Sequence, residues 1–138
     1  MDRDPVRAGT IVLTGFVGVT AVLGGLELIT GFPVEQPPEW LDGTPFSSYV
    51  VPGIALTSVV GGSALAAMAL ALRDDPRWQV ATGAAGTVLI GWISGEILLL
   101  AQPDPPSTIE VAYLGLGAAV VGLGWIAHRW GRRDTTVG

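Results

Sequence analysis

The stretch WQVATGAAGTVLIGWISGEILLLA, from Trp78 to Ala101, decides the fold class of this chain. It is a continuous run of mostly apolar residues, and its one charged residue is Glu96. A helix needs about 20 such residues to cross the hydrocarbon core of a bilayer. The run does not alternate between apolar and polar residues as a barrel strand does, so it predicts a membrane-spanning helix.

The composition of the whole chain agrees with a membrane protein. Of 138 residues, 49% are hydrophobic and only 14% are charged, and the mean hydropathy is +0.54, which is more apolar than an ordinary soluble domain. The absence of cysteine excludes disulfides, thiol chemistry and cysteine-ligated metal sites. With a single histidine, His128, and a net charge of −5, we expect no metal, no cofactor and no nucleic-acid partner.

Three further runs have the same apolar character, so the chain is predicted to form one domain, an all-α antiparallel bundle of four membrane-spanning helices. The predicted spans are residues 8–30, 49–72, 78–101 and 109–128. The first span follows two arginines, as a signal peptide would, but its 23 residues exceed a signal h-region, so we expect a retained helix. We expect the proline-rich loop of residues 31–48 to fold back over one end of the bundle.

The positions of the arginines predict the orientation of the bundle. All seven basic residues lie near the chain ends or in the turn RDDPR between the second and third spans. The other two connections carry acidic residues and no basic one. Because basic residues are retained on the cytoplasmic side, we predict a multi-pass protein of the cell (inner or plasma) membrane with both termini in the cytoplasm.

Small residues on the third span predict close helix packing. Gly83, Thr87, Gly91 and Gly95 recur every four residues, and the last two form a GxxxG pair. Small residues let helix backbones approach closely within a bilayer. We favour tight packing inside the monomer, and a homodimer face stays open as the alternative, because GxxxG pairs occur in packed spans of every kind.

Two carboxylates lie inside the predicted spans at similar depth. Glu96 is five residues from the outer end of its span, about 7.5 Å of helix rise, and Glu27 is three residues from the end of its span, about 4.5 Å. An ionised acid in lipid is costly unless it is paired or solvated. We therefore predict a common ligand-binding cavity under the proline-rich loop. Trp92, one helical turn from Glu96, is a candidate to line it with Trp40 and Tyr113.

A purely structural role for these residues stays open. Either acid could extend its side chain to the outer interface or hydrogen-bond a neighbouring helix. Trp40 could be an apolar anchor of the loop. Glu110, at the start of the fourth span, is expected to be a first-turn acid.

The start of the second span is marked by prolines. Thr44 followed by Pro45 could serve as a helix N-cap and first helical position. Pro52, seven residues later, would then kink the helix or mark its true start.

The motifs GTPFSSYVVPGI (Gly43–Ile54), RDDPRW (Arg73–Trp78) and GWISGEILLL (Gly91–Leu100) resemble those of a widespread set of small prokaryotic four-span membrane proteins. That set pairs a G-S/T-P-F…P-G motif with a W…E motif on the third span. The resemblance covers most of the chain and implies the four-span topology, but no activity. Its recurring positions correspond to Pro45, Phe46, Pro52, Trp92 and Glu96. This favours a role for Glu96 beyond packing.

Three classes of function stay open at this point. The first is a module that binds or transports a small cationic or amphipathic molecule, or a proton, through the carboxylate cavity. The second is a structural or accessory protein of the lipid bilayer that packs with itself as a homodimer, or with a larger membrane-protein partner. The third is a lipid- or quinone-directed enzyme, which we rank last because the sequence supplies no nucleophile–base pair, metal cluster or phosphate loop.

Overall fold

The computed structural model describes the backbone of residues 4–137 and the side chains of residues 5–130. In this part of the chain there is no strand, and four helices are long and apolar enough to cross a membrane. Those four segments are Pro5–Thr30, Val50–Leu72, Trp78–Leu99 and Thr108–Trp130. The prediction of an all-α, four-helix, multi-pass architecture is therefore confirmed.

The helices follow the predicted spans closely. The elements in chain order are α1 (Asp4–Thr30), the short η1 (Pro38–Leu41), α2 (Val50–Ala55), η2 (Leu56–Gly61), α3 (Gly62–Leu72), α4 (Trp78–Leu99) and α5 (Thr108–Val137). The segments α2, η2 and α3 form one continuous span, in which η2 is a π-helical stretch. The main difference between the predicted spans and the helices is at the end of α5, which continues to Val137. The apolar pattern marks where contact with lipid ends, and a helix can continue beyond that point.

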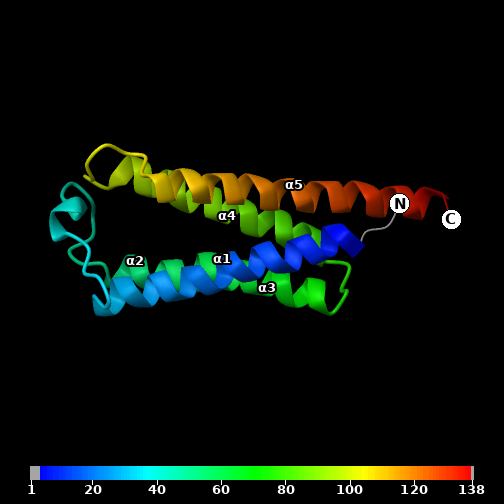
Figure 1. Cartoon of the computed structure of the whole chain (residues 1–138), viewed down its shortest axis with the longest axis horizontal. Coiled ribbons are helices and arrows are strands. Elements are labelled where there is room, and N and C mark those ends of the chain that lie inside the picture. The colour runs from blue at the N-terminus through cyan, green and yellow to red at the C-terminus, as the bar shows by residue number, and fades with distance from the viewer. Residues whose placement is uncertain (1–3, 138) are drawn as a thin grey trace.

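Figure 1 shows the helices as two antiparallel pairs, α1 with α2–η2–α3 and α4 with α5. The two pairs lie against each other where α1 begins and where α3 turns into α4. They diverge toward the opposite end, where the η1 loop and the α4–α5 connection lie. The long loop of residues 31–49 joins the first pair, and residues 100–107 join the second. The short turn of residues 73–77 joins α3 to α4, so it makes the two pairs adjacent at that end.

The turn between α3 and α4 joins the two pairs at their closed end. Arg7 Nη1 lies 3.1 Å from Asp74 Oδ1, which links the start of α1 to this turn. Asp75 accepts hydrogen bonds from the side chain and the backbone of Arg77, at 2.9–3.1 Å. These bonds lower the pKa of Asp75 to about 2, so its carboxylate is ionised at neutral pH. Both ion pairs are largely exposed, so they orient the turn more than they stabilise the fold.

Two apolar clusters hold the spans together. The cluster at the closed end contains Ala71, Trp78 and Ala127. The larger cluster lies midway along the bundle and draws on the first three spans. Its buried members are Val17, Ala21, Val60, Ala64, Leu89 and Ile93. The larger cluster lies where the two helix pairs begin to diverge. It therefore closes the space between the pairs on the side of the α3–α4 turn.

The small-residue stripe predicted on α4 makes few close contacts within the chain. A Cβ added to Gly83, Gly91 or Gly95 would meet no other atom within 4 Å, and Thr87 is exposed. Only Gly83 takes part in a close approach, because its backbone N lies 2.7 Å from where a Cβ on Gly124 would be. Gly91 and Gly95 therefore make no close helix contact within the described part of the chain. Residues spaced by four drift by about 40° per step around a helix, so the stripe turns away from α5. The homodimer alternative stays a prediction.

Other glycines make the close helix contacts. Between α4 and α5, a Cβ on Gly86 would lie 2.7 Å from Val121 N and 2.8 Å from Gly117 O. Between α1 and α2, a Cβ on Gly25 would lie 2.6 Å from Gly53 O. Backbones that approach this closely gain van der Waals contact, which drives helix association in lipid. Each helix pair is therefore held by its own glycine contact.

The start of the second span differs from the sequence prediction. The hydroxyl of Thr44 accepts a backbone N–H two residues on, as an N-cap would, but the chain turns there and Pro45 is not helical. The helix begins at Val50, and Tyr49 is its N-cap residue. Pro52 therefore lies in the first turn, where a missing N–H costs no hydrogen bond within the helix. Of the two alternatives for Pro52, the mark of the true start is correct.

Candidate functional site

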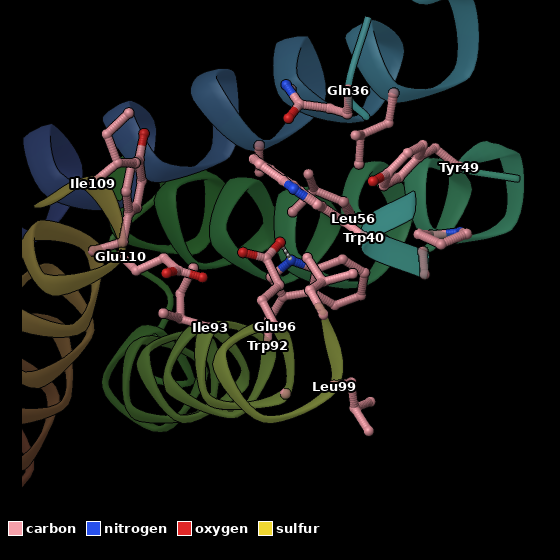
Figure 2. Close-up of a pocket in the computed structure, with 18 of the residues that line it drawn as sticks. Gln36, Trp40, Tyr49, Leu56, Trp92, Ile93, Glu96, Leu99, Ile109 and Glu110 are labelled. Carbon is pink, nitrogen blue, oxygen red and sulfur yellow. Dashed lines mark hydrogen bonds between the residues drawn. The ribbon is translucent and has the colours of Figure 1, made fainter. Parts of the chain in front are cut away.

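A cavity of about 710 Å³ lies where the two helix pairs diverge (Figure 2). All four spans contribute to its wall, and so does the proline-rich loop of residues 31–48, here named the outer loop after its predicted side of the membrane. Its volume falls within the range of ordinary small-molecule sites. The π-helical η2 begins at this wall with Leu56, and π-helical turns often occur at functional sites.

The deep part of the cavity is apolar. The side chains of this part belong to the larger core cluster or pack against it. They are Val17, Ala21, Leu56, Leu89 and Ile93. Polar and aromatic side chains gather nearer the helix ends, under the outer loop. The cavity is therefore amphipathic, with an apolar floor and a polar mouth.

Three carboxylates line the cavity, Glu27 from α1, Glu96 from α4 and Glu110 from α5. Because α4 ends at Leu99, two residues earlier than predicted, Glu96 and Glu27 are each three residues from the end of their helix, about 4.5 Å of rise. No arginine or histidine is among the described residues of the wall. The carboxylates therefore have no cationic side chain within the cavity to balance them.

Glu96 is held by Trp92 on the same face of α4. Trp92 Nε1 donates a hydrogen bond of 2.7 Å to Glu96 Oε1, between residues four apart in the helix (Figure 2). Within the described part of the chain, no other side chain or backbone group donates to this carboxylate. Trp92 thus orients the carboxylate through one oxygen and leaves most of its accepting capacity unused.

Glu110 has a different environment. Ser107 N donates to Glu110 Oε1 at 2.8 Å, and Glu110 N donates to Ser107 Oγ at 3.2 Å, which is a capping box at the start of α5. Gln102 Nε2 lies 2.8 Å from both carboxylate oxygens. Glu110 is only 5% exposed. The prediction of a first-turn acid is confirmed, and local donors already hold both of its oxygens.

Three hydrogen bonds hold the outer loop over the cavity, one to α1, one to the residue before α2 and one to a residue after α4. Gln36 Nε2 lies 3.5 Å from Glu27 Oε1 of α1. The Tyr49 hydroxyl, just before α2, donates to Pro37 O at 2.6 Å. Burial, and then the charge of Glu39, raise the pKa of Tyr49, so this donor keeps its proton at neutral pH.

The third tie crosses between the two helix pairs. The backbone N–H of Ala101, just after α4, donates to Trp40 O at 2.8 Å. Trp40 lies in η1, and its side chain lines the cavity in the same view as the Trp92–Glu96 pair (Figure 2). Because this bond joins the loop to α4, η1 spans the mouth of the cavity from one helix pair to the other.

All five residues that the sequence predicted for a binding site line this one cavity. They are Glu27, Glu96, Trp92, Trp40 and Tyr113. Tyr113 also stacks on Phe16 of α1, with ring centroids 6.5 Å apart, and so joins α5 to α1.

Sequence reasoning missed several polar residues of the wall, among them Gln36, Tyr49 and Glu110. The Ser-x-x-Glu spacing that ends at Glu110 is a capping-box signal, but it gives no indication of a cavity. Gln36 lies in the irregular loop of residues 31–48, and Tyr49 directly follows it. In such a segment, sequence periodicity does not predict which way a side chain points. Only the folded loop brings them to the site.

The three carboxylates are spread along the wall and do not form a metal centre. In the described part of the chain, no group of three or more His, Cys, Asp or Glu side chains could hold a metal ion. Comparison of the chain with protein-family models, with curated proteins and with solved structures finds no match.

Proposed function

We propose that this protein binds small amphipathic organic cations in the cavity between its two helix pairs. The observation that carries the proposal is a cavity wall with three carboxylates and no arginine or histidine among its described residues. Charges interact more strongly in a medium of low dielectric than in water, so carboxylates within the spans attract a cation. The apolar floor accepts the apolar part of such a molecule.

Aromatic side chains at the polar mouth support the same ligand class. The aromatic residues of the wall are Trp40, Phe46, Tyr49, Trp92 and Tyr113. A cation over an aromatic face gains about 0.5–2 kcal/mol, and a delocalised organic cation also gains from contact with the rings. Carboxylates and aromatic rings therefore favour the same charge.

The proposal includes an orientation in the cell (inner or plasma) membrane. The arginines with described side chains are Arg7, Arg73, Arg77 and Arg129. They lie at the closed end of the bundle, opposite the cavity, which supports cytoplasmic termini. The cavity then lies within the outer leaflet, under the outer loop.

Two ions of the same shape and opposite charge test the proposal. Tetraphenylphosphonium and tetraphenylborate have similar apolar surfaces, so a difference between them reports charge recognition. We expect the purified protein in phosphatidylcholine nanodiscs to bind the cation saturably in equilibrium dialysis, and to bind the anion at least about tenfold more weakly. Equal binding of both ions, or no saturable binding of the cation, would contradict the proposal.

Matched variants show where the cation binds. We expect Glu27→Gln with Glu96→Gln to weaken binding of tetraphenylphosphonium by about tenfold or more, because both charges leave the cavity wall. Glu35→Gln with Asp104→Asn is the control, since both are exposed residues outside the cavity wall and the variant removes the same number of charges. Circular dichroism of each variant checks that the helices are retained. Equal weakening by the control would place the cation on the surface.

A further inference from the structure

The carboxylates of the cavity differ in how much hydrogen-bonding capacity they have left. An ionised glutamate has two oxygens with about four accepting positions. Glu110 already accepts from Gln102 and from the backbone of Ser107. Glu96 accepts one bond, from Trp92, at one oxygen. A ligand that donates hydrogen bonds is therefore accommodated at Glu96 and not at Glu110. Glu27 also has accepting capacity left, but its contact with Gln36 Nε2, at 3.5 Å, is too long to orient it as Trp92 orients Glu96.

The geometry points to a protonated amine that carries an apolar chain, with its ammonium group bound to Glu96 and its chain running along α4 into the cavity floor. This inference rests on the proposed function and narrows its ligand class. It separates amines with N–H groups from quaternary cations, which have no hydrogen to donate.

The ammonium group favours Glu96 because it can donate hydrogen bonds to the carboxylate. An alkylammonium, like the end of a lysine side chain, has several N–H donors. A charged donor and a charged acceptor form short bonds that are roughly twice as strong as neutral ones. Trp92 fixes one oxygen of Glu96 and so holds the other in place for such a bond. A quaternary ammonium of the same chain length gains attraction to the charge but none of these bonds.

The direction of the alkyl chain follows from the side chains of α4 that line the cavity. Trp92, Ile93 and Leu89 lie four, three and seven residues before Glu96, so all four side chains share one face of the helix and all line the cavity. The distance along the axis from Glu96 to Leu89 is about 10 Å. Leu89 is the residue of α4 nearest the closed end of the bundle that lines the cavity, and it belongs to the larger core cluster. An alkyl chain of matching length therefore replaces water along an apolar surface without displacing core side chains.

Decylamine and decyltrimethylammonium test the inference, because they share a chain and a charge and differ in N–H groups. Each displaces radiolabelled tetraphenylphosphonium from the protein in phosphatidylcholine nanodiscs, with free concentrations corrected for uptake by empty nanodiscs. We expect decylamine to displace the label at about tenfold lower concentration. Equal potency, with the label still bound saturably, would overturn the inference and leave the proposed function intact. Failure of the label to bind would overturn both.

Two variants assign the preference to Glu96. We expect Glu96→Gln to bring the two potencies to within about twofold, because a neutral amide loses the charge-assisted bonds. Trp92→Phe keeps an aromatic ring and removes the N–H that orients Glu96, so it should reduce the preference in part. A full preference in a folded Glu96→Gln protein would overturn the assignment. If Glu96→Gln does not fold, a full preference for decylamine in Trp92→Phe would overturn the assignment instead.

The amine can come from a free amphipathic molecule or from a lipid headgroup. Nanodiscs made with phosphatidylethanolamine in place of phosphatidylcholine distinguish the two sources. A lipid amine that occupies the site would raise the concentration of decylamine needed for displacement. An unchanged value would assign the site to free amines.

Discussion

At the scale of single residues, space and hydrogen bonds decide what each position does. Gly25 lies where α1 meets α2, and a Cβ there would clash with Thr57 Oγ1 and lie 2.6 Å from Gly53 O. The neighbouring atoms are partly backbone, so they cannot move aside as a flexible side chain would. Gly62, by contrast, is a helical glycine with no atom within 4 Å of an added Cβ.

These two glycines give a matched pair of variants. We expect Gly25→Ala to lower the free energy of unfolding by about 1–3 kcal/mol, because the methyl group forces α1 and α2 apart. Gly62→Ala should change stability by less than about 1 kcal/mol. Thermal unfolding in detergent, followed by circular dichroism, measures both. If the two variants unfold at the same temperature, the close contact between α1 and α2 is not present.

Hydrogen bonds also separate the three carboxylates of the cavity, Glu27, Glu96 and Glu110. Glu110 is buried and held by Gln102 and Ser107, so its role is to start a helix. Glu96 accepts one hydrogen bond, and Glu27 has one long contact with Gln36. Sequence position identifies acids within or beside a span, but only neighbours in space show which acids have capacity left for a ligand.

At the scale of elements, helix ends carry information that apolar runs do not. The fourth span was found by its apolar residues, and its start is set by the capping box between Ser107 and Glu110. The second span was placed within one residue of its true start, although Pro45 was wrongly assigned to the helix. The π-helical η2 inside that span left no signal in the sequence, because it differs from an α-helix only in its hydrogen bonds.

The capping box predicts a local effect. We expect Ser107→Ala to destabilise the first turn of α5 by about 1 kcal/mol, because Glu110 N loses its acceptor. Faster hydrogen exchange at residues 108–111 measures this loss, and Thr108→Ala, which keeps the capping pair, is the control. Unchanged exchange would show that the cap does not hold the turn.

At the scale of the whole molecule, two helix pairs joined at one end leave a cavity at the other (Figure 1). The shape follows from where each pair finds its own close contacts, at Gly25 for one pair and at Gly86 for the other. The pairs meet through the core clusters and through the turn at Asp74 and Asp75. The outer loop then bridges the open end through Trp40.

The orientation of this molecule is tested by single-cysteine variants, since the chain has no cysteine of its own. Asp42 is exposed in the outer loop, and Pro76 is exposed in the turn between α3 and α4. We expect a membrane-impermeant maleimide to label Asp42→Cys in intact cells, and to label Pro76→Cys only after permeabilisation. The reverse pattern would place the cavity in the cytoplasmic leaflet.

The sequence by itself determined the number of spans, their order and most of their bounds. Each of these depends on one segment and the bilayer, because a run of apolar residues is matched to lipid whatever its neighbours do. Tertiary structure decided that Gly86 and Gly117 meet while Gly91 and Gly95 do not. It also decided that Glu27, Glu96 and Glu110 line one cavity. The physical reason is that the rotation and tilt of a helix are set by contacts with segments distant in the chain, and a single-segment pattern carries no record of them.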